Sequence, residues 1–313
     1  MSELKFHPYI DGLIKYAFAN PTTPMWELST ADVRRTRNEV ITKLMGPGEE
    51  VGKIKELRVP VEGGEINLRL YYPSDEPGLP IFMWFHGGGW VVGSLDTHDS
   101  PCRALANRCR ACVASVDYRL APEHKFPVAV YDCMAATSWV AENAVSLGLD
   151  AGRITLGGDS AGGGLVFAVA LLARDQGGPA LQKLVSVYPS IDIAGFERES
   201  FKKYWDKVIL SGPVCDYYRK EYLKEPEDAA NPLASPLFAE DLSGLPPTLI
   251  ITAEHDVLTS EGEAMAEVLK EAGVDVTYSC YPGMIHLFYG MGQLTEEENG
   301  LAETGRWYRQ KNV

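Results

Sequence analysis

The sequence contains no apolar run of the length that a membrane-spanning helix needs. Its longest apolar stretches, such as Leu165–Ala173, are far too short for that role. The opening residues, from Met1 to Pro8, include no apolar core of a secretory signal. We therefore expect a protein without a membrane span that works in the cytoplasm.

Basic residues are also scarce. The chain of 313 residues has 29 Lys and Arg against 43 Asp and Glu, which gives a formal net charge of −14 at pH 7. This balance argues against a nucleic-acid partner, because binding phosphates requires clustered Lys and Arg. Hydrophobic residues make up 45% of the chain, as in ordinary globular proteins. The expected partner is a small molecule.

The cysteines lack the spacing of a metal site. Cys109-x-x-Cys112 has no second cysteine pair and no histidine pair at the distance that zinc ligands need. We predict reduced, partly buried thiols and no metal, with a redox pair or a disulfide as the alternative. The six cysteines are Cys102, Cys109, Cys112, Cys133, Cys215 and Cys280.

Short apolar segments alternate with helical segments along most of the chain. The expected strands are Ile66–Tyr72, Ile81–Phe85, Cys112–Val116, Ile154–Leu156, Leu184–Tyr188, Leu249–Thr252 and Val274–Tyr281. The expected helices are Pro101–Arg110, Val128–Asn143, Ala161–Asp175, Ser260–Ala272 and a C-terminal stretch from Glu296. This alternation is typical of an α/β fold with a mostly parallel sheet.

Two segments stand outside the alternation. Residues 1–50 have a helical pattern, and residues 191–225 form an aromatic-rich insert between two strands. Inserts at the carboxyl ends of strands lie over the ligand crevice in open α/β sheets. We predict a helical cap made of these two segments over a core of residues 51–190 and 226–313. The alternative is an extra helical pair that packs against the side of the core.

Gly158-Asp-Ser-Ala-Gly162 lies between an expected strand and an expected helix. Small residues on either side of the serine allow the backbone to make such a tight turn. The serine then has a strained conformation, and its hydroxyl projects above the sheet. The motif alone is weak evidence, because an ordinary glycine-containing turn between a strand and a helix can have the same sequence. With its position, it makes Ser160 the candidate nucleophile.

A glycine run, His86-Gly-Gly-Gly-Trp90, follows the strand Ile81–Phe85 directly. Its unobstructed backbone N–H groups are suited to binding an oxyanion, with the N–H of Ala161 as a further donor. A flexible turn is one alternative. A phosphate-binding loop is another, but the run lacks the Gly-Lys-Ser/Thr ending of such loops.

A serine nucleophile requires a histidine base. If the chain order is Ser, acid, His, only His255 and His286 come after Ser160. We favour His286, which follows the last expected strand after an expected turn at Pro282-Gly283 and so lies at the same sheet edge as the serine.

The acid that orients the histidine is expected one strand earlier. Asp256 follows the strand Leu249–Thr252 and would fix the tautomer of His286. Asp192 and Glu254 are the alternatives. Asp159 is expected to lie on the wrong side of the turn and to act as a structural acceptor.

Taken together, these motifs resemble the hormone-sensitive-lipase-like carboxylesterases of the α/β-hydrolase superfamily, from about Ile66 onward. The resemblance implies an eight-stranded, mostly parallel sheet, a helical cap, no cofactor, the catalytic triad Ser160–Asp256–His286 and an oxyanion hole of Gly88, Gly89 and Ala161. It rests on His86-Gly-Gly-Gly-Trp90, Asp117-Tyr-Arg-Leu-Ala-Pro-Glu-His-Lys-Phe-Pro127, Gly157-Gly-Asp-Ser-Ala-Gly-Gly163, Ala253-Glu-His-Asp256 and Ile285-His-Leu-Phe288.

Some positions depart from the family pattern near the expected pocket. Trp90 replaces a common phenylalanine and Leu287 a common glycine. We expect Trp90, Leu287, Phe201 and Trp205 to contact the substrate. The predicted function is a serine carboxylesterase for short- to medium-chain acyl esters, and the resemblance also allows a homodimer. The alternatives are an amidase or deacetylase with the same triad, or a non-catalytic binding protein.

Overall fold

A computed structural model describes residues 4–310 of the chain. Its centre is an eight-stranded sheet in the order β1-β2-β4-β3-β5-β6-β7-β8. Strands β1 and β2 and the pair β2 and β4 are antiparallel, and all other neighbours are parallel, so the predicted fold class is confirmed. The strands are β1 (Lys53–Val61), β2 (Gly64–Tyr72), β3 (Leu79–Phe85), β4 (Cys112–Asp117), β5 (Leu149–Asp159), β6 (Leu181–Val187), β7 (Thr248–His255) and β8 (Val276–Ile285).

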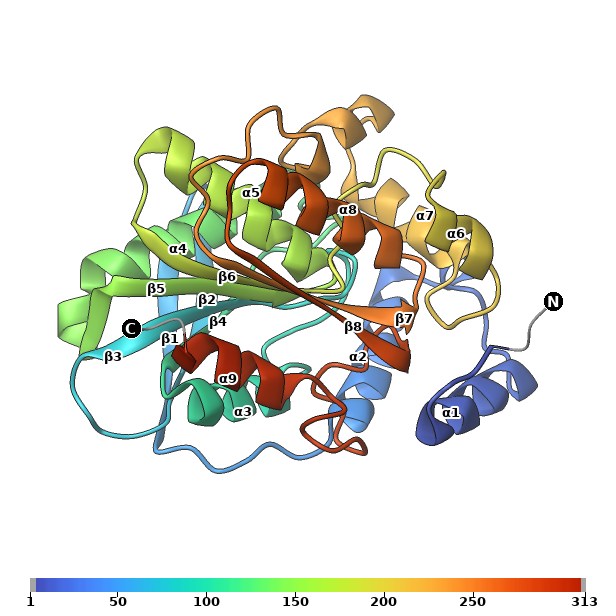
Figure 1. Ribbon diagram of the computed structural model, residues 1–313, viewed down its shortest axis with the longest axis horizontal. Helices are drawn as coiled ribbons and strands as arrows, with labels where there is room; N and C mark the ends of the chain where they lie inside the picture. Colours follow the sequence, from blue (N-terminus) through green and yellow to red (C-terminus); the bar gives the residue numbers. More distant parts are fainter. Residues whose placement is uncertain (1–3, 311–313) are drawn as a thin grey trace.

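Helices cover both faces of the sheet (Figure 1). On one face lie α4 (Val128–Leu147), α5 (Ala161–Gln176) and α8 (Thr259–Glu271), and on the other lie α3 (Asp99–Cys109) and α9 (Leu301–Gln310). Because both faces are covered, the central strand β3 is buried along its whole length, which explains its unbroken apolar sequence.

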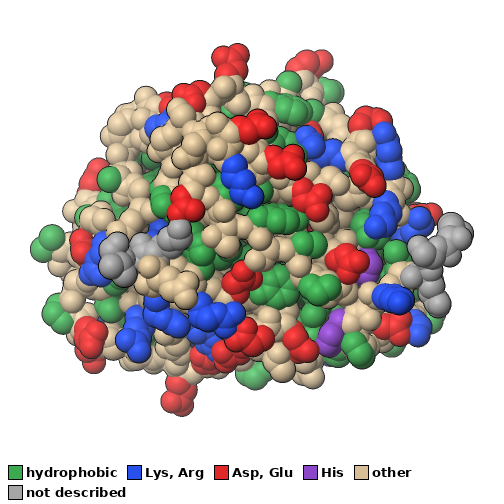
Figure 2. Space-filling view, in the orientation of Figure 1, with side chains coloured by type: hydrophobic (Ala, Val, Ile, Leu, Met, Phe, Trp, Pro, Cys, Tyr) green, Lys and Arg blue, Asp and Glu red, His purple; other side chains and the backbone are tan. Residues whose placement is uncertain are grey.

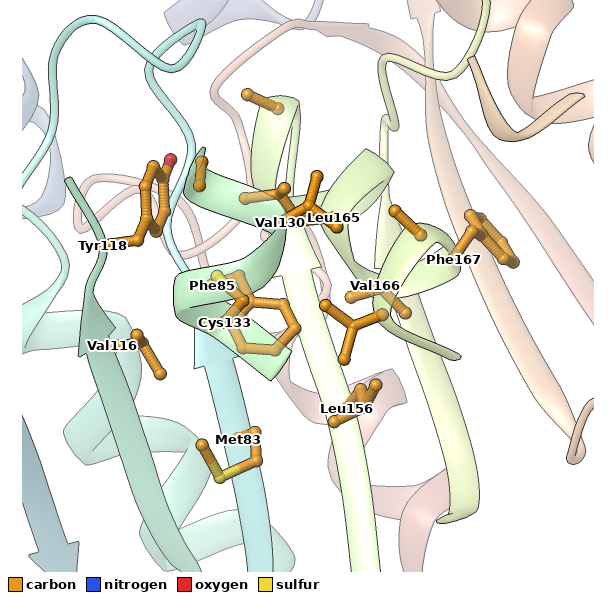
Figure 3. Close-up of a cluster of buried hydrophobic side chains, with 14 of the residues drawn as sticks. Met83, Phe85, Val116, Tyr118, Val130, Cys133, Leu156, Leu165, Val166 and Phe167 are labelled. Atoms are coloured by element: carbon orange, nitrogen blue, oxygen red, sulfur yellow. The ribbon is translucent and has the colours of Figure 1, made fainter. Parts of the chain in front are cut away.

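Figure 3 shows the packing between the sheet and the helices α4 and α5. Met83, Val116 and Leu156 project from three neighbouring strands toward Cys133 of α4 and Val166 of α5. Fully burying an aliphatic side chain of this size contributes about 1.5–3 kcal/mol. This core therefore holds rigidly the ends of β3 and β5, from which the two glycine motifs leave the sheet.

Four further helices lie at the end of the molecule toward which the parallel strands point (Figure 1). They are α1 (Pro8–Ala19), α2 (Thr30–Met45), α6 (Glu199–Tyr204) and α7 (Gly212–Tyr222), and short 3₁₀ turns occupy Met25–Glu27, Pro226–Ala230 and Pro236–Phe238. The two segments that interrupt the alternating sequence pattern thus meet at one end of the sheet.

The last strand, β8, differs from the prediction in one detail. We expected a turn at Pro282-Gly283, but β8 continues through both residues to Ile285. The irregularity is absorbed as a bulge, in which Tyr281 pairs with Ala253 and Ile285 with His255. Gly283 has a φ of +71° within this bulge, so a glycine that signals a turn here marks a bulge instead.

The surface and the thiols agree with the composition. Acidic side chains are scattered among Lys and Arg over the face shown in Figure 2. All six cysteines are free thiols in the structure; four are buried, Cys215 is half-buried and Cys280 is exposed. Between residues 4 and 310, no helix has the length and apolar character that crossing a membrane requires.

Candidate active site

Ser160 occupies a strained turn between β5 and α5. Its φ of 57° and ψ of −120° lie in a region that non-glycine residues rarely adopt. A Cβ on Gly162 would overlap the carbonyl oxygen of Phe85, and one on Gly158 would lie 2.5 Å from the carbonyl oxygen of Gly162. Both glycines are therefore required for the close approach that turns the hydroxyl of Ser160 out of the sheet.

The side chains of Ser160, His286 and Asp256 form one hydrogen-bonded chain. Nε2 of His286 lies 2.8 Å from Oγ of Ser160, and Nδ1 of His286 lies 2.6 Å from Oδ2 of Asp256. The second carboxylate oxygen of Asp256 accepts the N–H of Leu258 at 3.0 Å. Asp256 is completely buried, and this fixes the imidazole with Nδ1–H toward the carboxylate and Nε2 toward the hydroxyl.

Three backbone N–H groups of residues that line the pocket around Ser160 have no acceptor among the described residues. Within residues 4–310, the N–H groups of Gly88, Gly89 and Ala161 have no hydrogen-bond acceptor. Ala161 is the first residue of α5, so the positive end of that helix adds to the field. Gly88 has a φ of +124°, which a residue with a side chain cannot adopt without strain. The arrangement can stabilise negative charge on an oxygen bonded to the atom that Ser160 attacks.

A buried contact between Asp159 and His98 connects the two glycine motifs, and the sequence predicted only the role of Asp159. Asp159 accepts the N–H of Gly87 at 2.9 Å, and the same carboxylate oxygen lies 3.1 Å from Nε2 of His98. Nδ1 of His98 is 2.8 Å from the hydroxyl of Thr97. The sequence predicted Asp159 as a structural acceptor, but no pattern links it to His98.

The pKa of Asp159 reflects this pairing. Burial acts to raise the pKa, but the neighbouring His98 and the N–H of Gly87 outweigh burial and bring the pKa below its ordinary value. The carboxylate is therefore ionised at neutral pH, and a charged group holds the loop that carries Gly88 and Gly89.

His86 begins the glycine loop but lies away from Ser160. Its carbonyl oxygen accepts the hydroxyl of Tyr118 at 2.7 Å, and the two rings stack with centroids 4.3 Å apart. Burial lowers the pKa of His86 to about 4, so the ring is neutral at neutral pH. These contacts hold the start of the glycine loop against Tyr118, which follows β4.

The alternative acids and base have other hydrogen-bond or ion-pair partners in the structure. Nδ1 of His255 is 3.1 Å from the hydroxyl of Tyr204, and its Nε2 is 2.9 Å from the carbonyl oxygen of Lys5. Asp192 forms an ion pair with Arg198, and Glu254 accepts the N–H of Gly283. None of these three groups contacts His286.

A largely apolar pocket opens above the serine. Of the residues expected to contact substrate, Trp90, Leu287 and Phe201 line it. Trp205 does not: it is 39% exposed and packs edge-to-face on Phe196. The short helix α6 ends at Tyr204, so Trp205 follows the turn outward, and periodicity could not reveal that orientation.

One buried carboxyl in the pocket wall escaped the sequence analysis. Glu261 of α8 accepts the N–H groups of Ile191 and Asp192 at 2.8 and 3.0 Å. Burial raises its pKa well above the ordinary value. No group of His, Cys, Asp and Glu side chains that could hold a metal ion occurs between residues 4 and 310.

Comparisons with known proteins agree with this geometry. Residues 82–290 match a family model described as an alpha/beta hydrolase fold. An arylesterase from Saccharolobus solfataricus is 42% identical over 83% of this chain and 84% of its own length. The carboxylesterase NlhH from Mycobacterium tuberculosis is 40% identical over 89% of this chain and 88% of its own length.

The solved structures give the same result. A hyperthermophilic esterase from Pyrobaculum calidifontis superposes with a TM-score of 0.92 at 38% identity, covering 98% of this chain and 99% of that chain. The chain belongs to the α/β-hydrolase family, in its hormone-sensitive-lipase-like branch. The resemblance drawn from the motifs is thereby confirmed.

Proposed function

We propose that this protein is a serine carboxylesterase with Ser160 as nucleophile, His286 as general base and acid, and Asp256 as the group that orients His286. One observation carries the proposal: the hydroxyl of Ser160 lies 2.8 Å from Nε2 of His286 and beside three N–H groups without acceptors. The esterase names of the relatives in the comparisons support the same reaction class.

In the acylation step, the oxygen of Ser160 attacks the ester carbonyl carbon while Nε2 of His286 takes its proton. The carbonyl oxygen becomes an anion and accepts the N–H groups of Gly88, Gly89 and Ala161. His286 then gives the proton to the alcohol oxygen, the carbon–oxygen ester bond breaks, and the acyl group remains on Ser160.

Deacylation repeats these steps with water. His286 takes a proton from a water molecule, whose oxygen attacks the acyl carbon. The tetrahedral intermediate collapses, the proton returns to Ser160, and the carboxylic acid leaves. The neighbouring Asp256 stabilises the imidazolium that forms in each half-reaction.

Residues 4–50 and 191–225 form the proposed cap over this site; residues 1–3 of the predicted cap lie outside the described residues. Leu13 of α1, Ile41 of α2, Phe201 of α6 and Val214 of α7 all line the pocket. Their apolar side chains favour an apolar acyl chain, which we expect to be short to medium in length.

A p-nitrophenyl ester series of increasing acyl length tests the function, with Ser160→Ala as the control. We expect turnover to peak at short or medium chains and to vanish in the variant. Near-normal turnover by Ser160→Ala would overturn the proposal. The matching p-nitroanilide series tests the amidase alternative, which predicts comparable rates on both series. A non-catalytic binding protein would turn over neither.

The sheet also suggests how two copies could pair. Strand β8 is an edge strand, so one side of its backbone has no strand partner among residues 4–310. We propose a homodimer through this edge, and sedimentation equilibrium tests it: a monomer at micromolar concentration would contradict the pairing.

A further inference from the structure

The wall of the active-site pocket contains four Asp, Glu and Arg side chains: Arg37, Asp192, Arg219 and Glu261. Three of them are satisfied within the protein. Asp192 lies 2.6 Å from Arg198, and Arg219 lies 2.9 Å from Asp216. Glu261 accepts two backbone N–H groups, and its raised pKa favours the neutral form. The fourth side chain, Arg37, differs from these three.

Arg37 of α2 is half-buried and has no hydrogen-bond or ion-pair partner among residues 4–310. It is an exception in this molecule, because every other half-buried arginine forms an ion pair with a carboxylate. These arginines are Arg34, Arg69, Arg103, Arg108, Arg119, Arg153, Arg174, Arg198 and Arg219. A guanidinium that is partly desolvated without a partner is unfavourable, and an anion entering the pocket would relieve that cost.

A second donor without a partner among the described residues lines the same pocket as Arg37. The ring of Tyr218 from α7 lies directly over Gly89, where a Cβ on the glycine would overlap it. The Tyr218 hydroxyl has no hydrogen-bond partner among the described residues. Burial raises the pKa of this hydroxyl, while the nearby Arg37 guanidinium acts in the opposite direction. A charged and a neutral donor therefore both line the pocket, and the ring of Tyr218 lies against the proposed oxyanion loop.

The position of α2 indicates which part of an ester would reach these donors. Nε of Arg34 donates to the carbonyl oxygen of Val91 at 2.9 Å, and the N–H of Gly93 donates to the side chain of Asn38 at 3.0 Å. Both contacts hold α2 against the segment that follows the glycine loop. The alcohol of the ester has to lie near Nε2 of His286, which protonates it. We infer that the acyl part, on the other side of the carbonyl carbon from the alcohol, extends toward the pocket wall that α2 supplies.

We propose that the preferred substrates are esters whose acyl chain ends in a carboxylate, that is, half-esters of dicarboxylic acids. The guanidinium of Arg37 and the hydroxyl of Tyr218 bind the carboxylate, and the apolar wall covers the methylene groups between the two ends. This inference rests on the proposed esterase function. The net charge of −14 repels anions in general, so selectivity for a carboxylate requires a local site of this kind.

Monoethyl adipate and ethyl hexanoate test the proposal, because their acyl chains have equal length and differ in the terminal group. The measured quantity is the ratio of kcat/KM for monoethyl adipate to that for ethyl hexanoate, from ethanol release near neutral pH. We expect Arg37→Met to lower this ratio about 10- to 100-fold, the range that corresponds to losing hydrogen bonds to a charged group. Tyr218→Phe should lower it several-fold.

The matched control is Arg35→Met on the same helix. Arg35 is exposed, pairs with Asp32 and does not line the pocket, so this variant should keep the wild-type ratio. An unchanged ratio in Arg37→Met, or an equal fall in Arg35→Met, would overturn the inference. If the wild type hydrolysed ethyl hexanoate but not monoethyl adipate, the half-ester inference would be overturned and the esterase function would stand. If it hydrolysed neither ester, the esterase function itself would be overturned.

Discussion

The buried carboxylate beside the nucleophile gives a quantitative prediction. Asp159 accepts the N–H of Gly87 and pairs with His98, so a charged group connects the nucleophile turn to the glycine loop. In Asp159→Asn, an oxygen still faces Gly87, but both interactions become neutral. Charge-assisted hydrogen bonds contribute about 1.5–3 kcal/mol against about 0.5–1.5 for neutral ones. The free energy of unfolding should therefore fall by about 2 kcal/mol over the two bonds.

The effect on catalysis follows from what the loop carries. Removing a whole oxyanion donor lowers kcat by about 10²–10³-fold. Loosening the loop is a smaller perturbation, so we expect Asp159→Asn to lower kcat by about 10–100-fold. KM should change little, because the N–H groups of Gly88 and Gly89 act on charge that develops only in the transition state.

A matched control separates loss of stability from loss of positioning. Asp132 is also buried and pairs with Arg119, but it lies outside the pocket. Asp132→Asn should be destabilised to a similar degree in urea unfolding while its kcat for p-nitrophenyl butyrate remains near that of the wild type. If Asp159→Asn lost stability but kept the wild-type kcat, the positioning argument would be refuted.

Three further changes test other parts of the site. Gly88→Ala should lower kcat about 10²–10³-fold, because its Cβ would overlap the carbonyl oxygen of Val92; steady-state kinetics would show it, and normal kcat would contradict it. Asp256→Asn should lower kcat about 10⁴-fold by favouring the wrong tautomer of His286, and a loss below tenfold in the same assay would exclude that role. The pKa of Glu261 is raised above 4.5 in the folded state, so the contribution of Glu261 to wild-type stability falls as pH rises from 4.5 toward the folded-state pKa. Glu261→Gln cannot ionise, so its stability relative to wild type should increase over that pH range in urea unfolding, and a pH-independent difference would contradict the account.

Much of the fold could be predicted because buried parallel strands have a strong sequence signal. The unbroken apolar run of β3 reflects cover on both faces. Strand β1 was missed for the opposite reason. It lies at the edge of the sheet, pairs only with β2, and exposes most of its residues between Lys53 and Val61, so its sequence reads as polar.

The same contrast holds at the site. Ser160, Asp256 and His286 each follow a strand directly, and in a parallel sheet the carboxyl ends of strands meet at one edge, so chain order alone brought the three together. The contact of His98 with Asp159 could not be predicted in this way, because His98 does not follow a strand. It is the residue directly before α3. Arg37 and Tyr218 come from helices whose placement over the sheet no local pattern determines.

Covalent labelling tests the central claim most directly. A fluorophosphonate should react once per chain, and mass spectrometry of the digested protein should place the adduct on Ser160, with ester turnover falling in proportion to labelling. Ser160→Ala should remain unlabelled and inactive while unfolding at a similar urea concentration. Full inactivation with the adduct on another residue, or ester turnover retained by Ser160→Ala, would contradict the account.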